Sequence, residues 1–208
     1  MTEIIQGHTF EYYEDEHLYL VDGVIKPSIT QILKAKFPNK YSGISEEVLT
    51  RAASEGTKVH EAIEQYCKGI ESDLPEVAGF AMLQRLFKFE VVENEVPVIL
   101  YMDGEPAACG RLDLSLYWRD RYGGADIKRT SKLDKEYLAY QLNLYRIAYK
   151  QTYGIDWEFL WGIHLRGDVR RIVELPINEE MAIEAVKEYM KGQENEQSNT
   201  DWQTDERP

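Results

Sequence analysis

Two acidic residues and one lysine stand where neighbouring strands would bring their side chains together. Asp126 and Lys128 are two residues apart in a strand-like run, so both project from one face while Ile127 points to the other. Asp113 occupies the polar face of the preceding strand-like run, in which alternate positions are apolar. A hairpin that turns through 121–124 would place Asp113 beside Asp126.

Such a group of side chains is suited to the hydrolysis of a phosphodiester bond. Two neighbouring carboxylates repel by several kcal/mol at an effective dielectric constant of about 20, unless a cation lies between them. Oxygen ligands favour Mg²⁺ or Mn²⁺. A lysine on the same face can stabilise charge at the phosphorus or orient a water nucleophile. The alternative is a solvated sheet face on which Lys128 is only the cross-strand charge partner of the two acids.

Two further polar patterns lie on either side of these strands. Gly56-x-x-x-His60 falls in a helix-like segment before them, and Gln141-x-x-x-Tyr145 falls in a helix-like segment after them. Gln141 is the polar exception in an apolar helical stripe, and a buried amide needs hydrogen-bond partners such as a phosphate, water or carboxylate. Taken alone, His60 fits an ordinary surface histidine, and Gln141 and Tyr145 fit an amphipathic helix.

The elements that must position these residues follow from periodicity and turn residues. Residues 1–26 predict a β meander with a hairpin turn at Asp22-Gly23, and Ser28 and Gln31 have capping-box spacing at the start of a helix that ends near residue 36. Further helices are predicted at about 45–67, 76–89, 134–152 and 178–191, and strands at 90–101, 108–118, 124–129, 156–165 and 169–175. This order predicts an α/β fold with one mixed β-sheet flanked by helices.

The chain is predicted to hold one folded domain and a tail. Residues 1–191 carry the periodic segments and form the single domain. Residues 192–208 contain five acids, one arginine and a single large apolar residue, Trp202. Because such a segment cannot build a core, we predict a disordered acidic tail.

The charge of the chain limits how it can bind nucleic acid. Its 208 residues include 24 basic and 37 acidic side chains, giving a net charge of −13. This balance argues against a protein that holds DNA by a broad basic surface. An enzyme that binds DNA through a divalent metal and a local groove is still compatible with it.

Composition also indicates a compartment. No apolar run approaches the roughly 18 residues of a membrane span, and the N-terminal residues lack the pattern of a signal peptide. Cys67 and Cys109 are too few for a disulfide scaffold or a four-thiolate iron–sulfur cluster. We therefore expect a protein of the reducing cytoplasm with no membrane partner.

Taken in order, the motifs resemble the PD-(D/E)XK nuclease superfamily, specifically its RecB-like exonuclease branch. The matching segments are GTKVH (56–60), VENEVPV (92–98), GRLD (110–113), DIK (126–128) and QLNLY (141–145). The segment YLVDGVIKPSITQIL (19–33) also resembles the N-terminal signature of phage-borne and mitochondrial genome-maintenance members. The resemblance covers about residues 19 to 165 and implies a restriction-endonuclease-like fold. With only two cysteines, the chain is similar to the members that lack an iron–sulfur cluster.

The resemblance implies a role for each matching residue. The implied metal ligands are the side chains of His60, Asp113 and Asp126 and the carbonyl group of Ile127. Lys128 corresponds to the catalytic lysine, and Glu95 matches the acidic catalytic position of the preceding strand. Glu93 lies on the same face by alternation, so the choice between the two glutamates stays open.

Substrate contacts are implied for four residues. Gln141 and Tyr145 would line the site from the crossover helix, and Arg111 and Arg129 would contact DNA. Further candidates for a local basic path are Lys58, Lys132 and Lys135. The alternative is that these cations are scattered surface charges.

The sequence thus predicts a Mg²⁺- or Mn²⁺-dependent DNA exonuclease of phage or bacterial recombination and repair, acting in the bacterial host cytoplasm if a phage encodes it. A single-strand annealing protein or a helicase is the kind of protein partner such a nuclease has. One rival is a non-catalytic, nuclease-like DNA-binding or regulatory protein. The other is an acidic DNA mimic that inhibits a host enzyme.

Overall fold

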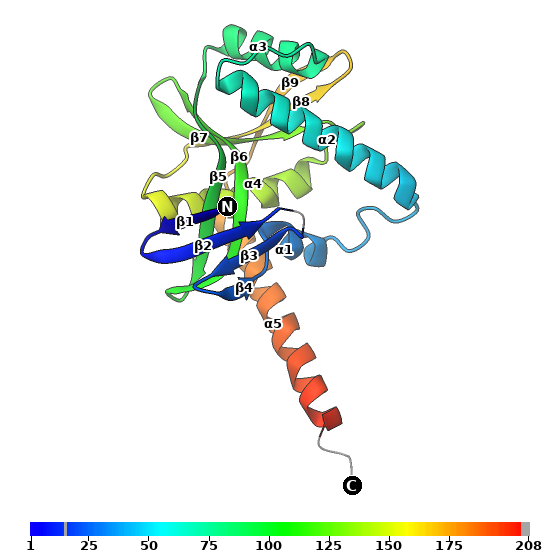
Figure 1. The fold of residues 1–208 in the computed structure, drawn as a ribbon, viewed down its shortest axis with the longest axis vertical. Helices are drawn as coiled ribbons and strands as arrows, with labels where there is room; N and C mark the ends of the chain where they lie inside the picture. The colour runs from blue at the N-terminus through cyan, green and yellow to red at the C-terminus, as the bar shows by residue number, and fades with distance from the viewer. Residues whose placement is uncertain (15, 205–208) are drawn as a thin grey trace.

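A computed structural model describes residues 1–14 and 16–204 of the chain, with side chains within the last helix as far as residue 195 (Figure 1). It is an α/β fold with a four-stranded antiparallel sheet and a five-stranded mixed sheet. The first sheet consists of β1 (Thr2–Ile5), β2 (His8–Tyr13), β3 (Leu18–Val21) and β4 (Val24–Lys26). The second consists of β5 (Glu90–Met102), β6 (Glu105–Trp118), β7 (Arg121–Lys128), β8 (Phe159–Arg166) and β9 (Val169–Leu175). The helices are α1 (Ile29–Lys36), α2 (Glu46–Cys67), α3 (Pro75–Phe87), α4 (Lys135–Tyr153) and α5 (Glu179–Thr204).

The N-terminal sheet is the predicted β meander. Its strands pair in chain order, and Asp22 and Gly23 have φ angles of 51° and 75°, which suit a two-residue hairpin turn. Phe10 and Val21 are buried in a cluster with Ile99 of β5. The meander therefore packs directly on the larger sheet.

The larger sheet has the order β5-β6-β7-β8-β9 and is antiparallel except between β7 and β8. Since parallel neighbours need a crossover connection, α4 runs between β7 and β8. The turn predicted at 121–124 is wrong, because these residues belong to β7. The hairpin turns instead at Arg119 and Asp120, which adopt left-handed φ angles of 50° and 61°.

Helices cover the sheet on both sides and form two apolar clusters. α4 contacts β5, β7 and β8 and shares a cluster with α1 and α5. α2 and α3 pack over the other cluster, together with β6, β7 and β8. The predicted capping box of α1 is present, since Gln31 N donates to Ser28 Oγ at 3.1 Å and Ser28 N donates to Gln31 Oε1 at 2.7 Å. No helix among the described residues combines the length and apolarity of a membrane span.

The last helix corrects the predicted tail. α5 continues to Thr204, past the predicted end of the folded chain at residue 191, and projects away from the sheets (Figure 1). The prediction of disorder is therefore wrong for 192–204, while 205–208 lie outside the described residues. Absence of a core does not prevent a helix from continuing into solvent, because Glu and Gln are good helix formers.

Close packing at Gly124 makes a strong prediction about folding. A Cβ atom at this position would lie 2.0 Å from Cζ3 of Trp157, whose side chain is buried. Gly124→Ala is therefore expected to lower the free energy of unfolding by about 3 kcal/mol, measured by urea denaturation. Gly56→Ala is the matched control, because a Cβ atom there would have no neighbouring atom within 4 Å. In a helix interior, alanine in place of glycine raises the free energy of unfolding by up to about 1 kcal/mol. Equal stability of the two variants would contradict the packing at Gly124.

Candidate metal centre and active site

Four elements bring the site residues together at one point of the larger sheet. Asn94 pairs with Leu114 and Val96 with Leu112, so Glu95 of β5 lies opposite Asp113 of β6. Leu114 pairs with Ala125, so Asp113 in turn lies opposite Asp126 of β7. The predicted proximity of the two aspartates is therefore confirmed, and α2 adds His60 to the group.

His60, Glu95 and Asp113 form the candidate metal centre. One ligand atom from each of them lies within 4.8 Å of the others. His60 Nδ1 is 3.5 Å from Asp113 Oδ2 and 3.9 Å from Glu95 Oε1. One imidazole and two carboxylates are a donor set that fits Mn²⁺ or Mg²⁺.

The backbone of Ile127 orients two of these three side chains. His60 Nε2 lies 2.9 Å from the carbonyl oxygen of Ile127 and must donate to it, because a carbonyl only accepts. Ile127 N donates to Asp113 Oδ2 at 2.7 Å. Nδ1 of His60 is therefore the ring nitrogen that faces the carboxylates, as in metal sites where a backbone carbonyl fixes the histidine tautomer. The carbonyl of Ile127, predicted as a metal ligand, accepts from His60 in this arrangement.

Electrostatics shows why a cation suits this place. Burial alone would lower the pKa of His60, but the carboxylates of Asp113 and Glu95 outweigh it and raise the pKa to about 9. Burial raises the pKa of Asp113, against the opposing effect of His60 and Lys128. A proton on His60 thus balances the acids, and a divalent ion would supply that positive charge instead.

Asp126 and Lys128 form a buried ion pair beside the centre. Lys128 Nζ lies 2.7 Å from Asp126 Oδ2, and the Asp126 side chain is only 3% exposed. Burial, followed by the charge of Asp113, raises the pKa of Asp126 to about 6. Burial would lower the pKa of Lys128, but Asp126 and Asp113 raise it overall, so the amine stays protonated. Asp126 is predicted from the sequence as a direct ligand, but its carboxylate is not in the group within 4.8 Å and faces Lys128 instead.

The ambiguity between the two glutamates is resolved by the backbone. Glu95 lies opposite Asp113 in the strand register and has a left-handed φ of 50°, and its carboxylate is 3.9 Å from His60 Nδ1. Glu93 instead accepts a hydrogen bond of 2.7 Å from the hydroxyl of Tyr149. A non-glycine residue in this conformation is strained, and such strain is typical of functional sites.

Of the predicted substrate contacts, only Gln141 lines a cavity next to Lys128. Arg111 Nη2 lies 3.3 Å from Glu95 Oε2, and Arg129 is paired with both Glu55 and Glu76. Both guanidinium groups therefore satisfy internal acids. Tyr145 is 5% exposed and fills the space above Gly110, where an added Cβ would lie 2.8 Å from its ring. Its role in the structure is to support the sheet under the site.

The same cavity contains residues that the sequence patterns did not single out. Lys40 and Tyr41 come from the loop between α1 and α2, and Tyr137 comes from the first turn of α4. Their only signal in the sequence is an aromatic residue beside a lysine in a short loop.

Comparison with known proteins adds little about this site. No family model matches the chain, and no curated protein matches it. The crystal structure of SSO0001 is similar over 81% of this chain and 76% of that chain, with 17% sequence identity and a TM-score of 0.47. A similarity of this size assigns neither a fold family nor a function to the chain.

Proposed function

We propose that the protein is a Mg²⁺- or Mn²⁺-dependent deoxyribonuclease of restriction-endonuclease-like fold, and that it acts as an exonuclease. The observation that carries the proposal is the convergence of His60, Glu95 and Asp113 within 4.8 Å, beside a lysine held by a buried aspartate. A hard metal next to a fixed ammonium group is suited to phosphodiester hydrolysis. The motif series that resembles RecB-like exonucleases supports the same function.

Each side chain of the site has a task in this reaction. His60, Glu95 and Asp113 would hold the ion. When bound, Mg²⁺ or Mn²⁺ activates water and neutralises charge on the phosphate. Lys128 donates to the phosphate or to the attacking water, and the buried Asp126 keeps its ammonium protonated and aimed.

The setting of the proposal is DNA recombination or repair in a phage or bacterium. DNA is the proposed partner, with an annealing protein or helicase as the protein that would act with the nuclease. The cytoplasm is the proposed compartment. The two cysteines are free rather than joined in a disulfide, which agrees with it.

A comparison of linear and closed DNA tests this function. With Mn²⁺ or Mg²⁺, linear end-labelled DNA is expected to be degraded while covalently closed circles of the same sequence survive. The reason is that the excess of acids in a chain with a net charge of −13 repels internal duplex, so confinement of an end must contribute the affinity. EDTA is expected to abolish the reaction, and the products are resolved on gels over time.

Three outcomes would overturn parts of the proposal. Equal cleavage of closed circles would make the protein an endonuclease. Absence of cleavage in any divalent metal, together with gel-shifted DNA, would favour the non-catalytic DNA-binding protein. If DNA is ignored altogether and basic proteins are bound, the DNA mimic is the correct alternative.

A further inference from the structure

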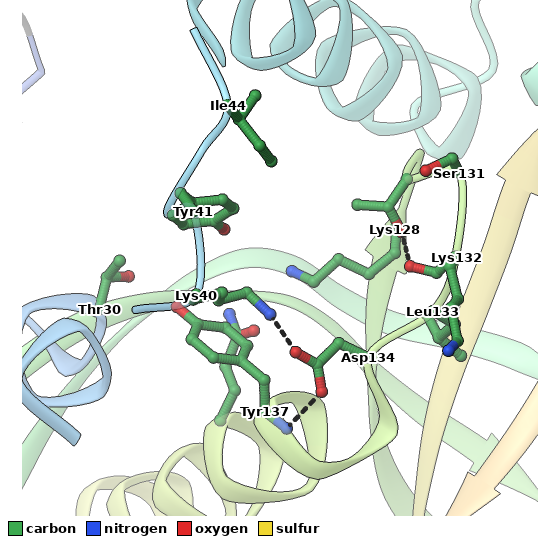
Figure 2. Close-up of a pocket in the computed structure, with 12 residues that line it drawn as sticks. Thr30, Lys40, Tyr41, Ile44, Lys128, Ser131, Lys132, Leu133, Asp134 and Tyr137 are labelled. Atoms are coloured by element: carbon green, nitrogen blue, oxygen red, sulfur yellow. Dashed lines mark hydrogen bonds and ion pairs between the residues drawn. The ribbon is translucent and has the colours of Figure 1, made fainter. Parts of the chain in front are cut away.

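A cavity of about 470 Å³ opens next to Lys128 (Figure 2). It lies between the α1–α2 loop, the segment after β7 and the start of α4. The side chains that matter for its chemistry are those of Lys40, Tyr41, Lys128, Lys132, Tyr137 and Gln141. In Figure 2 the Lys128 side chain reaches across it toward Lys40 and Tyr41.

We propose that this cavity binds one nucleotide of a single strand, with its base against Tyr41 and its phosphate against the lysines. The inference rests on the proposed function and names the form of substrate that reaches the metal centre. A volume of this size lies within the range of small-ligand pockets, about 300–1,000 Å³. It has room for a base that is unpaired and not for an intact duplex.

An exposed aromatic residue supplies a surface for stacking. Tyr137 is buried in the wall, and Lys40 Nζ covers its ring at 3.8 Å from the centre. Tyr41 is 48% exposed on the opposite loop, with Lys40 Nζ 5.7 Å from the centre of its ring, so it is the ring open to a base. Stacking on an aromatic side chain accepts any base, and this is how proteins commonly bind single strands without sequence preference.

The lysines make the cavity a local exception to the acidity of the chain. Three lysines line it. Lys40 pairs with Asp134 at 2.5 Å and Lys128 with Asp126 at 2.7 Å, so Lys132 contributes the positive charge that no ion pair balances among the described residues. A phosphate in the cavity would therefore meet an excess of positive charge. A concave site of one sign concentrates a ligand of the opposite sign, even when the net charge of the protein is −13.

A buried amide points independently to a bound ligand. Gln141 lines the cavity and is 8% exposed, and its Oε1 is buried without a hydrogen-bond partner among the described residues. A buried acceptor left without a donor costs stability. The amino group of a base would supply the missing donor.

Binding of a short fluorescein-labelled oligo(dA) by fluorescence anisotropy, with EDTA present to prevent cleavage, tests the inference. Tyr41→Ala is expected to weaken binding about tenfold, since stacking of a base on one aromatic residue contributes about that much. Tyr41→Phe keeps the ring and is expected to bind as the unmodified protein does. Tyr13→Ala is the matched control, because Tyr13 is 47% exposed but lies on β2 and outside the cavity.

Further binding measurements compare single-stranded DNA with duplex DNA and with RNA. A blunt duplex of the same length is expected to bind more weakly and to be insensitive to Tyr41→Ala. Equal loss for the duplex and the single strand would overturn the inference, as would unchanged oligo(dA) binding by Tyr41→Ala. A loss confined to oligo(A) RNA would also overturn it, because the proposed substrate is DNA.

The same variants keep this inference separate from the proposed nuclease activity. If Tyr41→Ala degrades linear DNA and binds oligo(dA) as the unmodified protein does, the nucleotide cavity is wrong and the nuclease stands. If the unmodified protein binds oligo(dA) in a Tyr41-dependent way but never cleaves DNA, the cavity stands and the nuclease is wrong. Thermal melting of each variant checks that the fold is intact.

Discussion

Asp113→Asn is expected to reduce Mn²⁺-dependent cleavage of linear DNA about a thousandfold or more. Asp113 is the member of the centre that faces His60 at 3.5 Å and lies opposite both Glu95 and Asp126. Loss of the Asp113 charge weakens binding of the metal ion. A metal stabilises the transition state of phosphodiester hydrolysis by several kcal/mol, and each 1.4 kcal/mol corresponds to about tenfold in rate. Single-turnover cleavage of end-labelled DNA measures the effect.

The fold of this variant is expected to survive. Asparagine keeps an oxygen that can accept a hydrogen bond from Ile127 N. The substitution also removes a carboxylate whose charged form burial disfavours, as its raised pKa indicates. The melting temperature without metal should therefore stay the same or rise, while the increase that Mn²⁺ gives the unmodified protein should disappear. Asp120→Asn is the matched control, because Asp120 lies in the β6–β7 turn with a left-handed φ of 61° that asparagine tolerates. Cleavage by Asp113→Asn within tenfold of the unmodified protein would refute the site.

Lys128→Met is expected to lower the rate of cleavage about a hundredfold or more while leaving Mn²⁺ binding in place. The ammonium group is paired with Asp126 and is not part of the ligand group of His60, Glu95 and Asp113. In the proposed mechanism it acts on the phosphate or the water and not on the ion. Rates at saturating Mn²⁺ and calorimetric titration with Mn²⁺ separate the two effects.

Substitution of Asp126, the ion-pair partner of Lys128, gives a second test. Asp126→Asn leaves the ligand group intact. It is therefore expected to lose cleavage, as Lys128→Met does, and to bind Mn²⁺ as tightly as the unmodified protein. Lys187→Met, at an exposed position of α5, is the matched control and is expected to cleave normally. Loss of Mn²⁺ binding in Lys128→Met or Asp126→Asn would contradict this division of roles.

Most of the fold could be predicted because its signals are local. The capping box of Ser28 and Gln31 and the turn at Asp22-Gly23 depend only on neighbouring residues, and both are present. The proximity of Asp113 and Asp126 follows from strand alternation and a hairpin, and it is confirmed even though the predicted position of the turn is wrong. Moving the turn from 121–124 to 119–120 shifts the pairing by an even number of residues, so both carboxylates stay on the same face, and the observed turn is the one that sets Asp113 opposite Asp126.

The parts of the site that could not be predicted depend on distant contacts. Alternation alone places Glu93 and Glu95 on one face, and the strand register separates them, since Glu93 pairs with Ser115 while Glu95 lies opposite Asp113. The sequence favours a DNA contact for Arg129 because its acidic partners are far away along the chain and meet it only in the folded protein. For the same reason nothing in the sequence joins Tyr41 to Tyr137 across one cavity.

The two hydrogen bonds of the Ile127 backbone have a consequence for the order of folding. The bond from His60 closes a loop of 67 residues, and β7, which carries Ile127, pairs in parallel with β8 across the segment that contains α4. Closing long loops and pairing parallel strands are slow steps, because chain entropy is lost before the contacts repay it. The ligands therefore reach their final positions only when nearly the entire domain is assembled. A partly folded chain lacks the complete candidate centre, so the proposed nuclease activity would begin only when folding ends.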